Sequence, residues 1–162
     1  MNTDCEFSPC RKYRWRLNRI WQPEKGVVNF CMLNPSIADE NRNDPTVATT
    51  IQLADRWGFG GVVVTNIFAW RATDPKDMRA AAEPIGAENN KHIQQVARSA
   101  KLVMIAWGAH GHYLNRGEQV LDGPLHGLKT YCLGWTESGQ PRHPLFVKRD
   151  KLPIRYRRRL LV

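Results

Sequence analysis

Four stretches of the sequence are apolar along nearly their whole length, and segments with helical periodicity separate them. They are residues 27–33 (VVNFCML), 61–70 (GVVVTNIFAW), 101–108 (KLVMIAWG) and 129–135 (KTYCLGW). Continuous apolar runs of this kind are typical of strands that are covered on both faces. Strands joined through helices predict a parallel sheet. The sequence therefore predicts an α/β protein, a three-layer α/β/α sandwich around a mainly parallel, four-stranded central sheet.

Two Asp-Pro pairs mark the starts of predicted helices. Aspartate is a preferred N-cap residue, and proline suits the first helical position because an N–H there would have no helical partner. Asp44-Pro45 therefore starts one predicted helix and Asp74-Pro75 a second, shorter one. Apolar periodicity predicts further helices over residues 87–99 and 112–121. As caps, the two aspartates are predicted to be structural rather than catalytic.

Residues 12–21 alternate between apolar and polar side chains, which is the period of a half-buried strand. A turn follows at Pro23 and Gly26. This segment is expected to be an N-terminal hairpin strand, and residues 27–33 are its candidate partner. No repeat, linker or low-complexity segment interrupts the sequence, so residues 1–162 are predicted to form a single domain.

The composition predicts a folded globular protein. Hydrophobic residues make up 42% of the 162 residues and include six Trp, which is enough for one sizeable core. No apolar run approaches membrane-spanning length, and the N-terminus lacks a signal-peptide core. A cytoplasmic protein without a membrane partner is therefore expected.

The net charge is +9, from 24 Lys and Arg against 15 Asp and Glu. A basic balance favours polyanionic partners such as DNA, through phosphate contacts and counterion release. A general role in solubility explains the same charge equally well, so charge alone leaves both interpretations open.

Neither a metal nor a cofactor is predicted. The four cysteines are Cys5, Cys10, Cys31 and Cys132. The last two lie in apolar runs, where cysteine acts as a small hydrophobic residue, and the first two lack further ligands at metal-binding spacing. Reduced thiols are therefore expected. His110 and His112 lack a neighbouring carboxylate and are interpreted as loop residues.

Amide, aromatic and basic side chains follow the four predicted parallel strands. These residues are Asn34, Pro35 and Ser36; Asn66, Phe68, Trp70 and Arg71; Trp107 and Gly108; and Trp135 with His143 beyond it. Because ligands bind beyond the carboxyl ends of parallel strands, these residues are expected to converge. Aromatic faces stack on a heterocycle and amides bind its hydrogen-bonding edge. The sequence therefore predicts a site for a heterocyclic ligand at this edge.

Structural interpretations of the same residues remain open. The Asn-Pro-Ser turn is consistent with an amide that bonds to local backbone, although the abrupt end of the apolar run favours a functional role. Trp70 and Trp107 are more typical of a core than of a stacking platform. Arg71 is suited either to a phosphate or to an ion pair with Asp74.

Four motifs together carry a resemblance to a known family. MLNPSIADENRNDPT, NIFAWRATDP, IAWG and CLGWTESGQPRHPLFV resemble the domain-of-unknown-function 1643 family, which has an LNPSxAD motif. The resemblance covers nearly the whole chain. It implies membership of that family and no particular activity.

A second, more distant resemblance is to the uracil-DNA glycosylase superfamily. MLNP, VVTN, IAWG and RHPL stand in the order of its water-positioning, base-reading, Trp-Gly and His-Pro motifs. The resemblance implies that fold, with Asn34 orienting a hydrolytic water, Asn66 reading the base edge and His143 stabilising the departing base. Leu33 and Leu145 stand where many members of the superfamily have Gly and Ser, so uracil itself is not implied as the substrate.

Hydrolysis of an N-glycosidic bond needs a positioned water, a donor for the anionic base and a pocket for the flipped base. Asp39 or Asp44 can supply a true base if the loop folds back, because an amide is a poor one. Phe68 or Trp70 would stack on the base. The predicted catalytic residues are Asn34, Asp39 and His143; the predicted substrate-binding residues are Pro35, Ser36, Asn66, Phe68, Trp70, Arg71, Trp107 and Gly108; and the predicted nucleic-acid-binding residues are Arg142, Lys148, Arg155, Arg157 and Arg158.

Three functions are consistent with these features. The first is a glycosylase-like hydrolase that cleaves the N-glycosidic bond of a base, modified or not, in DNA. The alternatives are a hydrolase of free nucleotides or nucleosides and a non-catalytic nucleic-acid-binding module on the same fold. DNA or a nucleotide is therefore the expected partner. The basic run RYRRR near the C-terminus is equally consistent with phosphate binding and with a solvated chain end.

Overall fold

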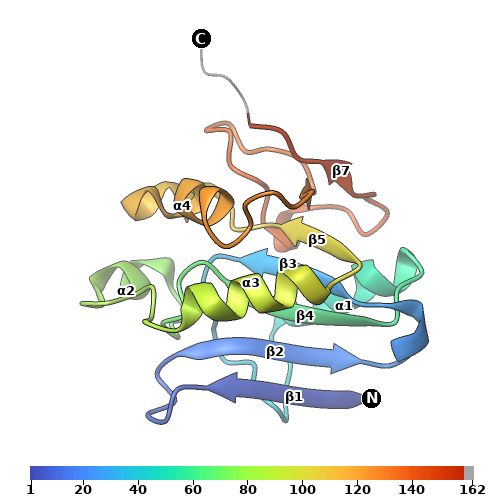
Figure 1. Cartoon of the computed structure of the whole chain (residues 1–162), viewed down its shortest axis with the longest axis horizontal. Helices are drawn as coiled ribbons and strands as arrows, with labels where there is room; N and C mark the ends of the chain where they lie inside the picture. Colours follow the sequence, from blue (N-terminus) through green and yellow to red (C-terminus); the bar gives the residue numbers. More distant parts are fainter. Residues whose placement is uncertain (159–162) are drawn as a thin grey trace.

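Seven strands within residues 1–158, the part of the chain that the structure describes, form one mixed sheet (Figure 1). In this computed structural model the strand order is β1-β2-β4-β3-β5-β6-β7. The strands are β1 (Asn2–Phe7), β2 (Arg14–Ile20), β3 (Val28–Met32), β4 (Gly61–Asn66), β5 (Leu102–Ile105), β6 (Tyr131–Cys132) and β7 (Ile154–Arg155). The α-helices are α1 (Pro45–Arg56), α2 (Pro75–Ala80), α3 (Asn89–Ser99) and α4 (Arg116–Asp122), and the 3-10 segments are η1 (Pro23–Lys25), η2 (Ala109–Asn115) and η3 (Pro144–Phe146). The predicted α/β class is confirmed.

The middle of the sheet is parallel and its margins are antiparallel. β3 pairs in parallel with β4 on one side and with β5 on the other, so that Phe30 lies opposite both Val64 and Met104. β5 and β6 are also parallel, whereas β1–β2, β2–β4 and β6–β7 are antiparallel. The carboxyl ends of β3, β4, β5 and β6 therefore lie along the same edge of the sheet.

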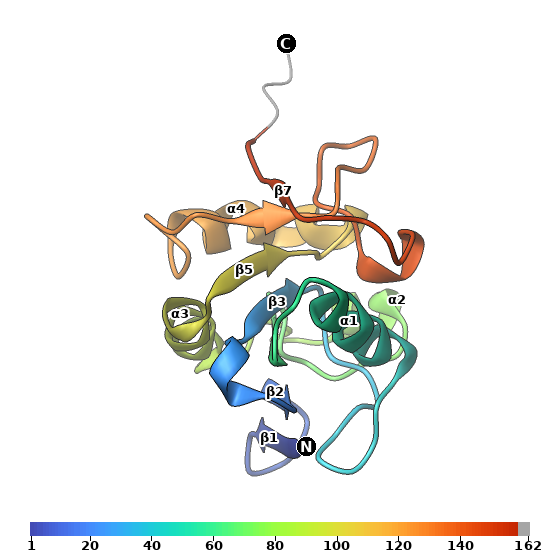
Figure 2. The ribbon, with the colours of Figure 1, turned by 90° about the vertical axis from the view of Figure 1, so that its right-hand side faces the viewer.

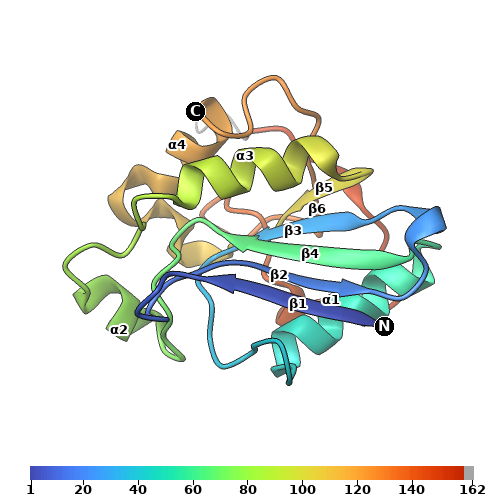
Figure 3. The same ribbon diagram turned by 60° about the horizontal axis from the view of Figure 1, so that its bottom comes forward.

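Helices cover both faces of the sheet. Figure 2 looks nearly along the strands and shows α3 on one side of the sheet and α1 on the other, and Figure 3 shows the same separation from another direction. Phe30 and Met32 pack with residues of α1, whereas Cys31 and Leu33 pack with residues of α3 and α4. This alternation follows from the two-residue period of a strand. Burial of one such large apolar side chain stabilises the fold by about 1.5–3 kcal/mol.

The candidate pairing of the first predicted strand with residues 27–33 is wrong. β2 lies between β1 and β4 and pairs antiparallel with both, because the two edges of β3 are occupied by the parallel strands β4 and β5. The N-terminal hairpin consists of β1 and β2. β1 was not predicted because it is an edge strand with the polar sequence NTDCEF and no fully buried residue.

Both Asp-Pro helix starts are confirmed. Asp44 is the N-cap of α1, and its Oδ1 accepts a hydrogen bond from Val47 N at 2.8 Å. Asp74 is the N-cap of α2, and its Oδ1 accepts from Lys76 N at 2.9 Å. Each cap satisfies one of the backbone N–H groups that the first turn of a helix leaves without a partner.

The helix expected over residues 112–121 is displaced. The chain first forms η2, whose last two residues, Leu114 and Asn115, have positive φ values of 54° each, and α4 begins only at Arg116. Apolar periodicity does not reveal such a backbone reversal, because it depends on φ rather than on side-chain polarity. No helix within residues 1–158 has the length and apolar character needed to cross a bilayer.

Candidate functional site

A cavity of about 860 Å³ opens at the carboxyl ends of the parallel strands. Segments that follow all four strands reach it: Asn34 after β3, Thr73 after β4, Gly108 after β5 and Thr136 after β6. The other lining residues are Leu33, Ser36, Asp44, Pro45, Thr46, Ala72, Pro75, Trp107, Ala109, His110, Arg142, His143, Leu145 and Phe146. Small-molecule sites have volumes of about 300–1,000 Å³. Asn34 and His143, on which the predicted site depends, line this one cavity.

The turn after β3 is clamped against the segment after β4. Asn34 Nδ2 donates to Ala72 O at 2.7 Å and to Pro35 O at 3.2 Å, and Ala72 N donates to Pro35 O at 2.9 Å. Ser36 Oγ and Thr73 Oγ1 are hydrogen-bonded at 3.3 Å. Because the amide nitrogen of Asn34 is engaged by two carbonyl oxygens, Oδ1 is the atom that it presents as an acceptor to a ligand. The turn interpretation and the site interpretation of this residue are therefore compatible.

His143 lines the cavity from the start of η3. Its Nδ1 accepts a hydrogen bond from Leu145 N at 3.3 Å, which assigns the proton of the neutral ring to Nε2. Burial lowers the pKa of His143 from 6.5 to about 4, against an opposing effect of the Asp44 carboxylate. At neutral pH the ring is therefore uncharged, and Nε2–H is the donor that it offers.

The Trp-Gly pair after β5 shapes the wall beside His143. Gly108 has a φ of 75°, which favours glycine, and an added Cβ would lie 3.4 Å from the Cβ of His143. Trp107 is 1% exposed, and its Nε1 donates to Gln140 Oε1 at 2.9 Å. Trp107 therefore belongs to the core and also forms part of the cavity wall.

Asp44, the alternative to Asp39 as a general base, is a site residue as well as a helix cap. Its side chain lines the cavity together with Pro45 and Thr46, and the residue is only 8% exposed. Oδ1 is committed to the helix cap, which leaves Oδ2 as the carboxylate oxygen available to a ligand. Topology was the signal that could have favoured Asp44 over Asp39: a crossover helix that follows a parallel strand starts near the ligand-binding edge.

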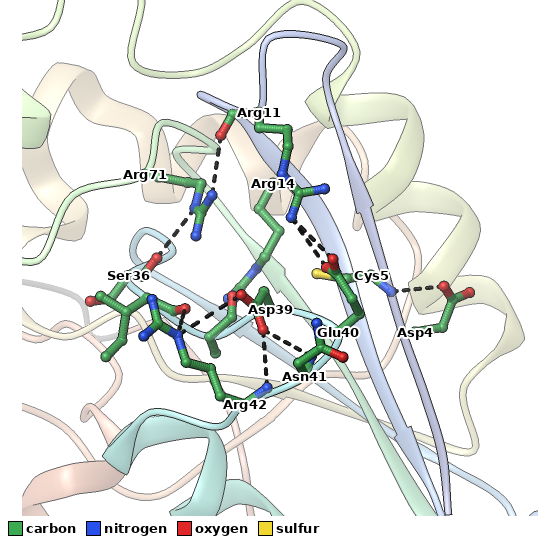
Figure 4. Close-up of polar contacts among 12 residues, drawn as sticks. Asp4, Cys5, Arg11, Arg14, Ser36, Asp39, Glu40, Asn41, Arg42 and Arg71 are labelled. Carbon is green, nitrogen blue, oxygen red and sulfur yellow. Dashed lines mark hydrogen bonds and ion pairs between the residues drawn. The ribbon is translucent and has the colours of Figure 1, made fainter.

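Residues 36–43 connect the turn at Asn34 to Asp44, and buried arginines hold this loop. Figure 4 shows Arg14 and Arg71 beside the loop and Arg42 within it. The loop acceptors are Ala38 O (3.1 Å from Arg14 Nη1), Asp39 O (bound by Arg19 Nη2), Arg42 O (3.0 Å from Arg19 Nη2) and Asn43 Oδ1 (2.8 Å from Arg19 Nε). Arg14 is 1% exposed and Arg19 is 2% exposed. Two of the cations that suggested a polyanionic partner are therefore used inside the protein.

Asp39, a predicted catalytic base, serves the same loop. Its Oδ1 accepts hydrogen bonds from Asn41 N at 2.8 Å and Arg42 N at 3.0 Å (Figure 4). These bonds, that from Asn41 above all, lower the pKa of the Asp39 carboxyl. Among the described residues that line the cavity, Asp39 is not present. The loop does not bring it to the site.

The segment after β4 places its predicted residues away from the cavity. Asn66 lines a separate recess of about 40 Å³. Phe68 is 0% exposed in the hydrophobic core, and Trp70 packs edge-on against Tyr13 with ring centroids 5.4 Å apart. Neither aromatic ring is among the described residues that line the cavity. β4 ends at Asn66, four residues before the apolar run ends at Trp70, so the apolar character of the run reflects burial beyond the strand as well as within it.

The predicted basic residues are dispersed. Arg142 lines the cavity and donates from Nε to Trp135 O at 3.2 Å. Arg71 lies over the ring of Phe7 at 4.8 Å and donates to Ser36 O at 3.4 Å, so it supports the loop. Lys148 and Arg157 are exposed and do not line the cavity. The guanidinium of Arg155 lies 6.0 Å from the centroid of the Tyr131 ring. Arg158 forms ion pairs with Asp122 at 2.6 Å and with Glu118 at 3.1 Å. Arg159, the last residue of RYRRR, lies outside the described residues.

The cavity also has an apolar border that was not predicted. Leu145 and Phe146 follow His143 on η3, line the cavity and are 41% and 78% exposed. Exposed apolar groups beside a cavity are typical of binding surfaces.

On another part of the cavity lining, His110 Nδ1 accepts a hydrogen bond from Arg79 Nη1 at 2.9 Å.

Within residues 1–158, no group of three or more His, Cys, Asp or Glu side chains is arranged to hold a metal ion. His110 is engaged by Arg79, and His112 Nδ1 lies 2.6 Å from Ala109 O. The four cysteines are free thiols, and Cys31 and Cys132 are buried as small hydrophobic residues.

A search of curated proteins found no match, and neither did a search of solved structures. The distant resemblance to the uracil-DNA glycosylase superfamily therefore stays a prediction. A family model does match residues 14–145, which run from the start of β2 into η3 and include both Asn34 and His143. This match confirms the family predicted from the LNPSxAD motif. The chain belongs to the family described as Protein of unknown function (DUF1643).

Proposed function

We propose that the cavity binds a nucleobase, modified or not, and that the protein hydrolyses the N-glycosidic bond of that base in DNA. The observation that carries the proposal is that the Asn34 amide and the His143 imidazole line one cavity of about 860 Å³. The parallel pairing of β4, β3, β5 and β6 supports the further proposal that the fold is uracil-DNA-glycosylase-like with a four-stranded parallel core.

The leaving base needs a hydrogen-bond donor. When the C1′–N bond breaks, its electron pair stays on the base, which becomes an anion. His143 is suited to this role because its ring is neutral, with a pKa of about 4, and carries its proton on Nε2. Such a ring donates a hydrogen bond without placing a charge in the cavity. The loss of one donor of this kind typically lowers the rate by about 10²–10³.

The attacking water needs an orienting acceptor and a base. Asn34 Oδ1 is positioned as an acceptor because its Nδ2 is held by Ala72 O and Pro35 O. An amide is too weak a base to remove the proton, whereas the Asp44 carboxylate lines the same cavity. In the proposed step the water oxygen bonds to C1′, its proton passes to Asp44, and the base departs as an anion that His143 stabilises.

A hydrolase of free nucleosides or nucleotides is the second candidate, and the distribution of charge favours it. Arg142 is the one arginine among the described residues that line the cavity, and no lysine is among them. Arg14, Arg19 and Arg116 are only 1–2% exposed, so the net charge overstates the charge that DNA would meet. The cavity volume also accommodates a ligand larger than a base.

The test is to incubate the protein with single- and double-stranded oligonucleotides that carry a panel of modified bases, and separately with free nucleosides. Alkali-labile abasic sites report activity on DNA, and chromatography of released base reports activity on free nucleosides. Asn34→Ala should abolish the activity, whereas Asn41→Ala, at an exposed position of the neighbouring loop, should retain it.

Equal activity of wild type and Asn34→Ala would refute the assigned site. Salt-sensitive binding of DNA without cleavage of any substrate would instead identify a non-catalytic binding module. Release of base from free nucleosides alone would select the second candidate.

A further inference from the structure

The two histidines that line the cavity have different charged neighbours. Asp44 is the charged group that affects the pKa of His143, and it is the one carboxylate among the described residues of the lining. Burial, Arg79 and His112 lower the pKa of His110, against an opposing effect of Asp74. His110 therefore lies in a separate part of the cavity where cations predominate, and the proposed reaction gives this part no role.

His110 offers one ring donor to a ligand. Its Nδ1 accepts a hydrogen bond from Arg79 Nη1 at 2.9 Å, and because a guanidinium can only donate, the proton of the neutral ring is on Nε2. The helix end that carries Arg79 is held by Tyr113, whose hydroxyl donates to Arg79 O at 3.1 Å. A cation that donates to one ring nitrogen polarises the ring and strengthens the other N–H as a donor. His110 Nε2–H is therefore suited to an anionic acceptor.

Arg142 lies on the chain segment next to His110. Gly108 N donates to Pro141 O at 2.8 Å, and this bond joins the segment that carries His110 to the segment that carries Arg142. Arg142 Nε donates to Trp135 O at 3.2 Å, which leaves the two Nη groups for a ligand. Both side chains line the same cavity. A guanidinium fork with an additional N–H donor matches the several oxygens of a phosphate group.

We propose that His110 Nε2 and the Nη groups of Arg142 bind a phosphate group attached to the sugar of the ligand. The cavity of about 860 Å³ has room for a sugar and a phosphate beside the base. The inference rests on the proposed function only in taking the ligand to be a nucleoside derivative. The phosphate belongs either to a free nucleotide or to the backbone of DNA, and the experiment separates these two sources.

The first test compares 2′-deoxyuridine and the four standard 2′-deoxynucleosides with their 5′-monophosphates. Dissociation constants of the full chain are measured by titration calorimetry or by ligand-observed NMR, and single-stranded oligonucleotides that contain the same bases form a further arm. A ligand that carries phosphate should bind about ten- to hundredfold more tightly than its nucleoside, as expected for hydrogen bonds to charged groups. The gain in a 5′-monophosphate identifies a free nucleotide, and a gain in the oligonucleotides alone identifies the DNA backbone.

Two outcomes of this comparison would overturn the proposal. One is equal binding of the nucleoside and of both phosphate-carrying forms for every base. The other is that none of the ligands binds at millimolar concentration.

Variants assign the gain to the two side chains. His110→Asn keeps an acceptor near the position of Nδ1 for Arg79 but removes the Nε2 donor, so the gain from phosphate should fall about tenfold while nucleoside binding stays unchanged. His110→Gln places an amide N–H near the position of Nε2 and should retain most of the gain. Arg142→Met should also reduce the gain about tenfold, because it removes the guanidinium fork.

His126→Asn and Arg56→Met are the matched controls, since both residues are exposed and neither lines the cavity. Both controls should bind every ligand as the wild type does. A folded His110→Asn or Arg142→Met variant that keeps the full gain from phosphate would refute the assignment. Equal losses of nucleoside and nucleotide binding would also refute it, because they would indicate a structural role.

The failure of this inference can be distinguished from the failure of the proposed function. A gain from phosphate that depends on His110, without cleavage of any substrate, would support the phosphate site and refute the hydrolase. Cleavage that depends on Asn34 but is unaffected by His110→Asn and Arg142→Met would support the hydrolase and refute the phosphate site.

Discussion

Two strand-to-helix connections, here called crossovers, leave the same edge of the sheet, and they contribute differently to the candidate site. One follows β3 and the other follows β4, and each leads to a helix that begins at an Asp-Pro cap. In the first crossover Asn34 and Asp44 line the cavity, and Asp44 is 8% exposed. In the second, Ala72, Thr73 and Pro75 line the cavity, whereas Asp74 is exposed and is not among the lining residues. The first crossover carries the candidate chemistry, and the second supplies shape and a carbonyl that orients Asn34.

The difference lies in the position of each crossover rather than in its local sequence. β3 is flanked by parallel strands on both sides, so its crossover starts at the middle of the ligand-binding edge. β4 has an antiparallel neighbour, β2, and its crossover starts nearer the margin. The first crossover is also fastened by the buried guanidinium groups of Arg14 and Arg19. The same Asp-Pro signal can therefore be a cap alone or a cap that also serves a site.

The largest expected effect is on activity. Asp44→Asn retains a good N-cap residue but removes the carboxylate, so the rate of base release should fall by about 10²–10⁴ if Asp44 is the general base. Asp74→Asn should leave the rate unchanged, because Asp74 does not line the cavity. Single-turnover rates on a substrate found in the proposed screen of oligonucleotides and nucleosides, with melting temperatures as a check on folding, measure both. Full activity of Asp44→Asn would show that Asp44 is not the general base, and the first crossover would then differ from the second in no catalytic carboxylate.

The next effect is on stability. Arg19→Met should lower the free energy of unfolding by about 3 kcal/mol, because it removes the donors of Asp39 O, Arg42 O and Asn43 Oδ1 from a buried site. Arg71→Met should cost about 1 kcal/mol or less, since Arg71 is half-buried and its bonds to Ser36 O and Arg11 O are long, at 3.4 and 3.3 Å. Urea denaturation measures both. Similar losses would mean that the buried Arg19 does not fasten the loop of the first crossover more firmly than the half-buried Arg71 does.

A smaller effect concerns pH. The pKa of His143 is about 4 in the folded protein, below its ordinary 6.5, so between these values the unfolded chain binds more protons. The free energy of unfolding should therefore decrease by about 2 kcal/mol from this residue as the pH falls from about 7 to about 4.5. His143→Gln should flatten that decrease. Asp44→Asn should make the decrease in stability steeper, because the Asp44 charge favours protonated His143 and its loss lowers the pKa of His143 further. Asp74→Asn should leave the decrease unchanged. Urea denaturation at several pH values measures all four slopes, and a wild-type slope equal to that of His143→Gln would contradict the assignment.

The parts of the fold that depend on local sequence could be predicted. Continuous apolar runs gave four strands, and the Asp-Pro pairs located two helix starts, because burial and capping act within a few residues. β1 could not be found in this way, since an edge strand gains stability from pairing with β2 rather than from an apolar face. The positive φ values of Leu114 and Asn115 could not be predicted either, because only a few per cent of non-glycine residues adopt them and no glycine marks the position.

For the candidate site, topology was a better guide than residue type. Asn34, Trp107, Gly108 and His143 line the cavity as expected from strand ends that share one edge. Phe68 and Trp70 were placed wrongly at that edge because aromatic residues after a strand serve a core as readily as a ligand. Asp44 was ranked behind Asp39 because its capping role already explained its presence in the sequence. The net charge was a poor guide to the charge on the surface, since charge alone does not reveal that Arg14 and Arg19 bond to loop carbonyls.

The smallest expected effect separates capping from chemistry. Asp44→Ala should cost about 1–2 kcal/mol of stability, because α1 has 12 residues, Asp44 is buried and Val47 N loses its acceptor. Asp74→Ala should cost about 0.5 kcal/mol, since α2 has only six residues and its cap is exposed. In urea denaturation, the Asn variants at both positions should retain most of the wild-type stability. If Asp44→Asn is as unstable as Asp44→Ala, the carboxylate is needed for folding, and a loss of activity in Asp44→Asn no longer identifies a catalytic base.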